Sequence, residues 1–378
     1  MMELFVILLI VLTVIYFIII LAYSFGWYYT PVFQPKKNTA EDTRISVIIA
    51  ARNEADNITA CLNALKKQSY SKEHFEVIVI DDNSEDGTYK IAEQITTSVE
   101  NWKTEKLENL VSEEKVSYKK QAITKGIELA TGKLIVTIDA DCVAPENWLT
   151  TIAQFYEAHH PKMMVMPVRF NEGNTPLQIF QQMDLSGLIG ITAGSLMWNF
   201  PVMANGANLA FEKKTFEAIN GYKGNEHLPG GDDIMLLLKI EKQYPQSVKF
   251  LKNNEVIVTT QTVNTLNEFY NQRLRWISKS GKFGDWKITA VLVLSYCFNA
   301  FVITGFFIGN IKIFLLSAII VVLKWLVEFY LVSSVSKFLQ HSFSWFNYIW
   351  SNIAHQLYVV VLGLLGITVK FEWKGRKY

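Results

Sequence analysis

Four long apolar segments constrain the fold of this chain more than any other feature of its sequence. One lies near the first residue and three follow a long central region: residues 4–23, 288–308, 313–335 and 346–369. A run of roughly 20 apolar residues is long enough to cross a bilayer as a helix. We therefore expect an integral membrane protein with one span before the central region and three after it.

The first apolar segment is expected to be an anchor that is not cleaved. Glu3 precedes it without any lysine or arginine, and no small-residue cleavage site follows before residues 27–29. Basic residues at positions 36, 37 and 44 come next, and such residues favour the cytoplasmic side. We expect residues 1–30 to anchor the protein in the inner (cytoplasmic) membrane, with the central region in the cytoplasm.

The three later segments leave the side of the C-terminus open. One span before and three after a cytoplasmic region would put the tail outside, yet residues 370–378 are basic and favour the inside. A segment that lies in the interface or re-enters the membrane would remove this conflict. Within the middle segment, Lys324 and Glu328 stand four residues apart on one helix face and can pair. Such charges usually face the interior of a bundle.

Composition excludes several classes of protein. The 378 residues allow one domain of roughly 250 residues plus membrane helices. A formal net charge of +1 gives no electrostatic basis for nucleic-acid binding. The three cysteines, Cys61, Cys142 and Cys297, form neither a CxxC pair nor a metal-ligand spacing. This sparse set fits a reducing compartment and argues against a disulfide framework.

The central region alternates between strand and helix patterns. Strands are expected at residues 45–50, 75–80 and 133–139, and helices at residues 55–68, 87–97 and 119–130. This succession predicts an α/β fold with a mostly parallel sheet. Neither a glycine-rich dinucleotide motif nor a Walker lysine loop occurs, which argues against NAD- and ATP-dependent enzymes. Residues 176–200 predict an amphipathic helix or pair of helices, either on the membrane surface or packed on the sheet.

An acidic pair, Asp139-Ala140-Asp141, follows the last of these strands. Two carboxylates one residue apart suit a hard divalent cation, and ligands of open α/β sheets bind at the carboxyl ends of strands. The pair alone is common, but three further motifs accompany it in order. They are Asp81-Asp82-Asn83-Ser84 upstream, and Gly230-Gly231-Asp232-Asp233 and Gln272-Arg273-Leu274-Arg275-Trp276 downstream.

In this order, on a chain with apolar segments at both ends, the motifs resemble those of membrane-bound family 2 glycosyltransferases. The similarity covers residues 45–279 and is greatest to ceramide and other lipid glucosyltransferases. It implies a GT-A nucleotide-sugar-binding domain at residues 40–283. Three transmembrane helices at residues 286–369 and a basic tail at residues 370–378 would follow it.

The resemblance implies a nucleoside pocket, in which Asp82 accepts a hydrogen bond from the uracil ring. Ala50, Arg52 and Glu54 would flank the same pocket. Taken alone, the segment around Asp82 is also a good turn and helix N-cap sequence.

The resemblance also implies a lysine that approaches the nucleotide, here assigned to Lys119. Most relatives have glycine where Tyr118 stands, so the resemblance does not fix which lysine of residues 119–125 takes this role, and lysines on a solvated helix face are common.

By the same resemblance, Asp141 binds Mg²⁺ or Mn²⁺ directly, and Asp139 contacts the ribose or the metal shell. Such an ion would stabilise the charge of the departing diphosphate. Asp233 would be the catalytic base, and Asp232 stands beside it where many relatives have glutamate. The alternative for both is stabilisation of a helix by acids in its first turn.

A helix at residues 265–280 would place Gln272, Arg275 and Trp276 on one face. Arg275 would meet the diphosphate and Trp276 the acceptor, and the alternative is a basic-aromatic anchor beside a membrane span. The segment that contains Gly206, Ala207 and Asn208 resembles one near the acceptor site: the two small residues would give room and the asparagine a polar contact.

Together these features predict an inverting, metal-dependent glycosyltransferase of the cell envelope. It would move a sugar from a UDP-sugar to a lipid or glycan acceptor at the cytoplasmic face of the membrane. A processive polysaccharide or oligosaccharide synthase of the same family is the first alternative, and a non-catalytic membrane scaffold is the second. The sequence names neither the sugar nor the acceptor.

Overall fold

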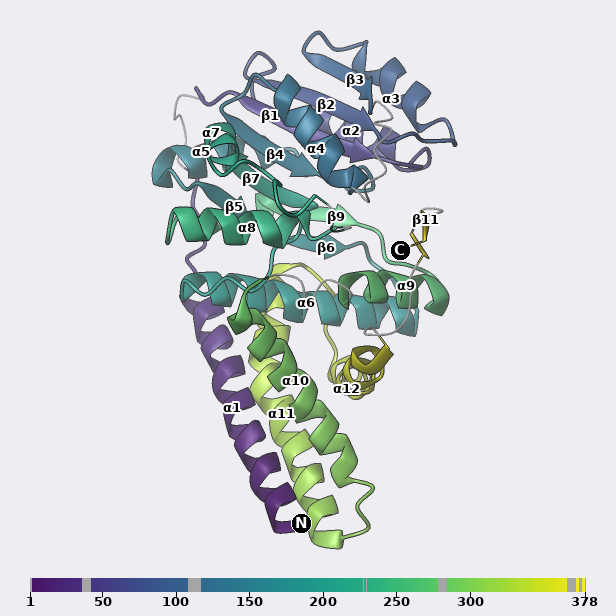
Figure 1. Ribbon diagram of the computed structural model, residues 1–378. Coiled ribbons are helices and arrows are strands. Elements are labelled where there is room, and N and C mark those ends of the chain that lie inside the picture. Colours follow the sequence, from purple (N-terminus) through teal and green to yellow (C-terminus); the bar gives the residue numbers. More distant parts are fainter. Residues whose placement is uncertain are drawn as a thin grey trace. The chain divides into compact units, whose positions relative to one another are not determined.

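The computed structural model describes residues 2–35, 42–107, 117–226, 228, 230–277, 284–365, 372–373 and 376–377. They form two compact units (Figure 1). The sheet unit contains Thr30–Asn171 and Leu196–Gln261. The helical unit contains Met1–Tyr29, Glu172–Ser195 and Thr262–Tyr378. The expected domain boundaries therefore differ from this division, because parts of residues 40–283 belong to the helical unit.

The sheet unit is built on a seven-stranded sheet with the order β3-β2-β1-β4-β7-β5-β8. Its strands are β1 (Ile45–Ala51), β2 (Phe75–Asp81), β3 (Trp102–Lys106), β4 (Leu134–Ile138), β5 (Met163–Val165), β7 (Asn208–Glu212) and β8 (Val248–Phe250). Neighbours are parallel except where β7 pairs with β4 and β5. Two short strands, β6 (Val168–Phe170) and β9 (Val258–Thr260), form a separate parallel pair. The predicted α/β fold with a mostly parallel sheet is confirmed.

Helices pack against this sheet and bury its apolar strands. They are α2 (Ile58–Lys66), α3 (Thr88–Thr96), α4 (Tyr118–Leu129), α5 (Trp148–His159), α7 (Lys213–Ala218) and α8 (Asp232–Gln243), with the 3-10 helix η1 (Asn254–Val256). Val47, Val77 and Val136, one from each of three adjacent strands, are fully buried in one core cluster. Helix α4 lies so close that a Cβ on Gly126 would stand 2.5 Å from Ile48 Cγ2.

The register of the central strands places their carboxyl ends at one edge. Ile48 of β1 pairs with Ile78 of β2 and with Thr137 of β4. Because these strands are parallel, the segments that follow Ala51, Asp81 and Ile138 leave the sheet at the same edge, as predicted.

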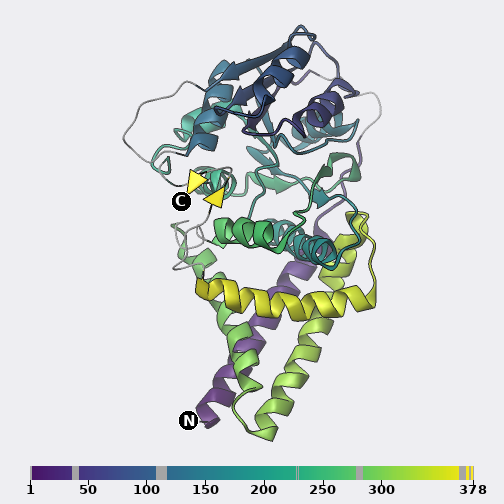
Figure 2. The same cartoon turned by 90° about the vertical axis from the view of Figure 1, so that its right-hand side faces the viewer.

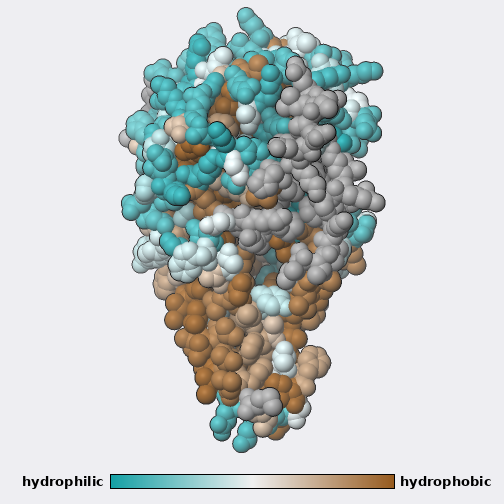
Figure 3. All heavy atoms as spheres, viewed as in Figure 1, coloured by the Kyte–Doolittle hydropathy of each residue, from teal (hydrophilic) through white to brown (hydrophobic). Residues whose placement is uncertain are grey.

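The helical unit contains α1 (Met2–Tyr29), α6 (Pro176–Met197), α9 (Leu266–Ile277), α10 (Trp286–Gly305), α11 (Ile311–Phe338) and α12 (Trp345–Leu365), with a short hairpin of β10 (Glu372–Trp373) and β11 (Arg376–Lys377). Four of these, α1, α10, α11 and α12, are long and apolar enough to cross a membrane. Helices α1, α10 and α11 run side by side (Figures 1 and 2). Hydrophobic residues gather on the surface over them (Figure 3).

Helix α6 is a single helix that is largely buried within the helical unit. It packs on α1 through glycines, since a Cβ on Gly194 would lie 2.3 Å from the carbonyl oxygen of Tyr23. It reaches α11 through Ser186, whose Oγ lies 3.1 Å from Ser336 Oγ. Within residues 176–200, Pro176–Met197 form one helix, and its part up to Ser195 packs inside the helical unit, where the sequence predicted an amphipathic surface helix or a helix on the sheet.

The predicted pair of charges in α11 is confirmed, with Lys324 Nζ 2.8 Å from Glu328 Oε2. Tyr16 of α1 donates a hydrogen bond to Glu328, and Lys324 donates to Asn352 Oδ1 of α12 at 3.0 Å. Lys324 is completely buried. Both charges therefore have partners inside the bundle, as expected for ionised groups among apolar helices.

Candidate active site

The acidic pair lies in the turn that follows β4, at the carboxyl edge of the sheet. The turn is fixed by Cys142, whose amide donates to the Asp139 carbonyl at 3.0 Å and whose thiol donates to Asp141 Oδ1 at 3.2 Å. Both carboxylates are half-buried. Cys61 lies behind them, with its thiol 3.8 Å from the Asp139 carbonyl oxygen. Burial is the main cause that raises the pKa of the Cys61 and Cys142 thiols, so neither is suited to be a nucleophile.

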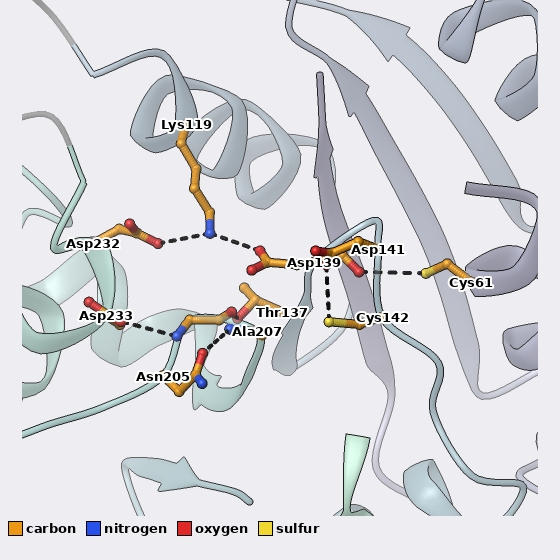
Figure 4. Close-up of polar contacts among 11 residues, drawn as sticks. Cys61, Lys119, Thr137, Asp139, Asp141, Cys142, Asn205, Ala207, Asp232 and Asp233 are labelled. Atoms are coloured by element: carbon orange, nitrogen blue, oxygen red, sulfur yellow. Dashed lines mark hydrogen bonds and ion pairs between the residues drawn. The ribbon is translucent and has the colours of Figure 1, made fainter. Parts of the chain in front are cut away.

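Lys119, near the start of α4, faces these acids (Figure 4). Its Nζ lies 2.8 Å from Asp139 Oδ1 and 3.7 Å from Asp232 Oδ2. Burial lowers the pKa of Lys119, but the carboxylates of Asp139 and Asp232 outweigh it and raise the pKa well above its usual value. The amine therefore stays charged at neutral pH.

Lys120 points elsewhere and is almost completely buried. Its Nζ donates to the carbonyl oxygens of Asn225 at 2.6 Å and Leu228 at 3.1 Å. The sequence did not decide between the two lysines. The geometry favours Lys119 for contact with a ligand and gives Lys120 a structural role.

The second acidic pair opens α8. Gly230 and Gly231 precede it with φ angles of 74° and 67°, in the left-handed region that glycine tolerates best. The Asp233 carboxylate accepts hydrogen bonds from the amides of Gly206 at 3.1 Å and Ile234 at 2.8 Å. Two backbone donors thus hold this carboxylate in a defined orientation.

Gly206 lies between the acids and the lysine. A Cβ at this position would stand 3.1 Å from Asp232 Oδ2 and 3.6 Å from Lys119 Nζ. Thr137 of β4 holds the Gly206 segment by donating to its carbonyl oxygen at 3.2 Å, and Ala207 donates its amide to Asn205 Oδ1 at 3.1 Å. Neither Thr137 nor Asn205 was predicted from the sequence to position the site. A hydroxyl in an otherwise apolar strand was the signal for the first.

Asn208 differs from its two neighbours, because its side chain is completely buried. Its Nδ2 donates to the carbonyl oxygens of Pro167 at 2.7 Å and Val256 at 2.8 Å. Its Oδ1 accepts from Trp148 Nε1 at 3.0 Å. Because its hydrogen-bond partners lie inside the fold, the Asn208 amide has a structural role. This burial argues against a contact between Asn208 and the acceptor.

The loops after β1 and β2, which hold the residues predicted for the nucleoside pocket, adjoin each other. Arg52 Nη1 donates to the Asp82 carbonyl oxygen at 2.7 Å and lies 3.7 Å from Asp82 Oδ1. The amide of Asp82 donates in turn to the Ala51 carbonyl at 2.8 Å, and that of Glu54 donates to Thr88 Oγ1 at 2.8 Å. Arg52 therefore fixes the loop that carries Asp82, and Ala50, near the end of β1, is half-buried.

Gln272, Arg275 and Trp276 lie on α9, in the helical unit. Between them stands Arg273, for which the sequence predicted no role. Its guanidinium is almost completely buried and lies 2.8 Å from Asp184 of α6. The Trp276 ring covers it, with its centroid 4.2 Å from Cζ. This ion pair joins α9 to α6.

Replacing Asp184 by alanine is expected to lower the free energy of unfolding by about 3–5 kcal/mol, because it would leave Arg273 buried without its partner. Thermal unfolding of the detergent-solubilised protein measures the change. Glu217→Ala is the control, since it removes an exposed pair with Lys213 at 4.0 Å and is expected to cost less than about 0.5 kcal/mol. Equal stability of the two variants would contradict the assigned role of the buried pair.

The residues at the sheet edge fit a divalent ion that is shared with a phosphate ligand. Among the described residues, no group of three or more His, Cys, Asp or Glu side chains is placed to hold a metal alone. Asp139 and Asp141 supply two hard carboxylates, and Mg²⁺ is typically bound by one or two carboxylates together with substrate phosphates. The donor set thus suits Mg²⁺ or Mn²⁺ on a diphosphate.

A mostly parallel sheet with acids at its carboxyl edge defines a nucleotide-sugar-binding domain of the GT-A type. Family models agree: Glycosyl transferase family 2 matches residues 46–217, and Glycosyl transferase family group 2 matches residues 134–369, more than half of the chain. The chain belongs to the family 2 glycosyltransferases.

Two curated relatives match parts of the chain. Glycosyltransferase AglE of Haloferax volcanii is 42% identical over 106 residues, which are 28% of this chain and 33% of that protein. A probable glycosyltransferase of Sulfolobus acidocaldarius is 24% identical over 248 residues, 63% of this chain and 50% of that protein. The chain thus spans half or less of the length of these relatives.

A solved structure supports the fold over almost the whole chain. Mannosyltransferase PcManGT of Pyrobaculum calidifontis, in complex with GDP-Man and Mn²⁺, aligns with a TM-score of 0.57 and 17% identity. The alignment covers 93% of this chain and 98% of that one.

Proposed function

We propose that this glycosyltransferase moves a sugar from a UDP-sugar to a hydroxyl of a lipid or lipid-linked acceptor, with inversion and with Mg²⁺ or Mn²⁺. The observation that carries the proposal is the convergence of Asp139, Asp232, Asp233 and Lys119 around Gly206 in the sheet unit. The charged Lys119 suits an anionic donor, and the carboxylates suit a cation on that donor and a hydroxyl acceptor. Gly206, which has no side chain, leaves room beside them.

The donor diphosphate would be held at the acidic pair. Asp141 and Asp139 would hold the divalent ion, which supplies Lewis-acid stabilisation of the leaving nucleoside diphosphate. Lys119 would add a second positive charge next to Asp139, where negative charge develops on the leaving group. With these two cations the leaving group needs no protein acid, unlike the substrates of glycoside hydrolases.

Asp233 would act as the general base. It would accept the proton of the acceptor hydroxyl as that oxygen attacks the anomeric carbon from the face opposite the diphosphate. The two backbone donors on its carboxylate support this role, because they fix its orientation before the acceptor binds. A single in-line displacement of this kind inverts the anomeric carbon.

The nucleobase assignment rests on Asp82, whose carboxylate would accept the uracil ring N–H. Arg52 supports it by fixing the Asp82 loop. The solved mannosyltransferase carries GDP-Man, so a guanine nucleotide is the direct competitor of this assignment. Ala50 and Glu54 would flank the base.

The acceptor would approach from the membrane. Four helices of spanning length support an integral membrane location. The basic residues that follow the first helix favour the cytoplasmic side for the catalytic residues. By resemblance, Arg275 and Gln272 would meet the diphosphate, and Trp276 the acceptor. Gly206 and Ala207 would leave room for its hydroxyl.

The test uses purified full-length protein with lipid extract and UDP-glucose, UDP-N-acetylglucosamine or GDP-mannose. Release of UDP is expected only with a UDP-sugar and a divalent ion. EDTA is expected to stop it, and excess Mn²⁺ to restore it. Mass spectrometry should find one added sugar per lipid, whereas a ladder of products would identify a processive synthase. The proposal fails if no nucleotide is released with any donor.

A further inference from the structure

Helix α12 runs in a different direction from the other long apolar helices of the helical unit. Helices α1, α10 and α11 run side by side, whereas α12 crosses them, nearly end-on in Figure 1 and broadside in Figure 2. Its 21 residues make it about 31 Å long, which is enough to span a bilayer. By length and composition α12 qualifies as a fourth membrane span. Its direction, however, differs from that of α1, α10 and α11.

Polar side chains of α12 face the interior of the unit. Asn352 accepts a hydrogen bond from the buried Lys324 at 3.0 Å, and the Tyr348 hydroxyl donates to the Trp325 carbonyl. His355 Nε2 lies 3.6 Å from Asp184 Oδ1. These contacts hold α12 across α11 and against α6, and they place its polar face over the charges of α11.

The outward face of α12 is apolar. Beyond Trp345 at its first position (56%), the exposed side chains of α12, with their exposed fractions, are Phe346 (78%), Ile353 (46%), Leu357 (53%), Val361 (51%) and Leu364 (60%). Their spacing of seven, four, four and three residues places them along one stripe of a helix. A helix in water shows the opposite pattern, with its polar face outward. This stripe therefore suits an apolar medium along the length of α12.

We propose that α12 lies in the plane of the membrane with this stripe against lipid acyl chains, so that the chain crosses the bilayer three times, through α1, α10 and α11. The inference rests on the membrane location proposed above. In this arrangement α1 crosses once before the sheet unit, and α10 and α11 cross twice after it. The two later crossings bring the C-terminus back to the side of the sheet unit. The basic tail at residues 370–378 then obeys the positive-inside rule, which four spans would violate.

Sidedness tests the proposal directly. Single cysteines are introduced as Lys90→Cys in the sheet unit, Phe307→Cys between α10 and α11, and Tyr378→Cys in the tail. A Cys297→Ala background removes the half-buried thiol, while Cys61 and Cys142 are buried. A membrane-impermeant maleimide is applied to intact cells and then to broken cells.

We expect the cysteines at positions 90 and 378 to react only after the cells are broken, and the cysteine at 307 to react in both. Reaction of position 378 in intact cells together with 307 would establish four spans and overturn the proposal. If 90 and 307 react from the same side, the membrane location itself fails. None of these readouts depends on transferase activity, so the outcome is separate from that of the enzyme assay.

Depth measurements supply a second, independent readout. Spin labels at Phe346→Cys, Leu357→Cys and Leu364→Cys in reconstituted protein are compared by their collision with oxygen, which concentrates in the bilayer centre. An in-plane helix is expected to give the same value at all three positions. In a spanning helix, Leu357 would lie about 16 Å from Phe346 along the axis and give a much higher value. Ile311→Cys and Ile319→Cys on α11 provide the reference gradient of a spanning helix.

Discussion

Replacing Asp233 by asparagine is expected to lower the rate of sugar transfer by about 10²–10⁴-fold, the usual contribution of a general base. Asparagine is nearly isosteric but cannot accept the hydroxyl proton at neutral pH. Binding of UDP with Mn²⁺, followed by calorimetry, is expected to stay within about twofold of the parent, since Asp233 would contact the acceptor rather than the donor.

Glu241→Gln is the matched control, an acid-to-amide change farther along the same helix α8. It is expected to retain full activity. If Asp233→Asn transfers sugar at the parental rate, another group is the base. If it loses nucleotide binding as well as activity, the carboxylate organises the donor site instead.

Replacing Asp141 by asparagine is expected to abolish the metal-dependent part of donor binding and to lower turnover by at least about 10²-fold. The variant removes one of the two carboxylates proposed for the ion and weakens the stabilisation of the leaving diphosphate. Electron paramagnetic resonance of Mn²⁺ with and without UDP would follow ion binding without requiring catalysis.

Glu146→Gln, an exposed acid in the segment that follows the same turn, controls for a general loss of negative charge. It is expected to bind Mn²⁺ and UDP like the parent. An Asp141→Asn protein that still takes up Mn²⁺ with UDP would move the metal site away from the acidic pair.

Much of the sheet unit was predictable because its signals are local. Runs rich in Val and Ile marked β1, β2 and β4, and their ends were predicted to within one or two residues. The antiparallel insertion of β7 between β4 and β5 was not predicted, because it depends on pairing between residues far apart in the sequence. Local patterns carry no information on such pairing.

The candidate site was predictable for a related reason. Parallel strands bring their carboxyl ends to one edge, so acids after separate strands were expected to meet there. The choice of Lys119 over Lys120 required the structure, because adjacent residues of a helix point about 100° apart and only the helix position decides which one faces the acids. The role of Arg273 was also hidden, since its partner Asp184 lies 89 positions away along the chain.

Hydropathy located α12 as an apolar segment but gave no direction for it. Its exposed apolar stripe and its buried polar face are both compatible with a segment of spanning length. The direction of a helix depends on the residues that each of its faces contacts. For α12 these residues include Lys324 and Asp184, which lie in distant segments of the sequence.

The division of the chain has a practical consequence for protein production. The segment Glu172–Ser195 leaves the sheet unit between Asn171 and Leu196, both of which belong to it. Deleting the first helix and everything after Gln261 would therefore not yield a water-soluble fragment, because α6 would remain with its buried face uncovered. Detergent would still be required, unless a short polar linker replaced α6 at the same time.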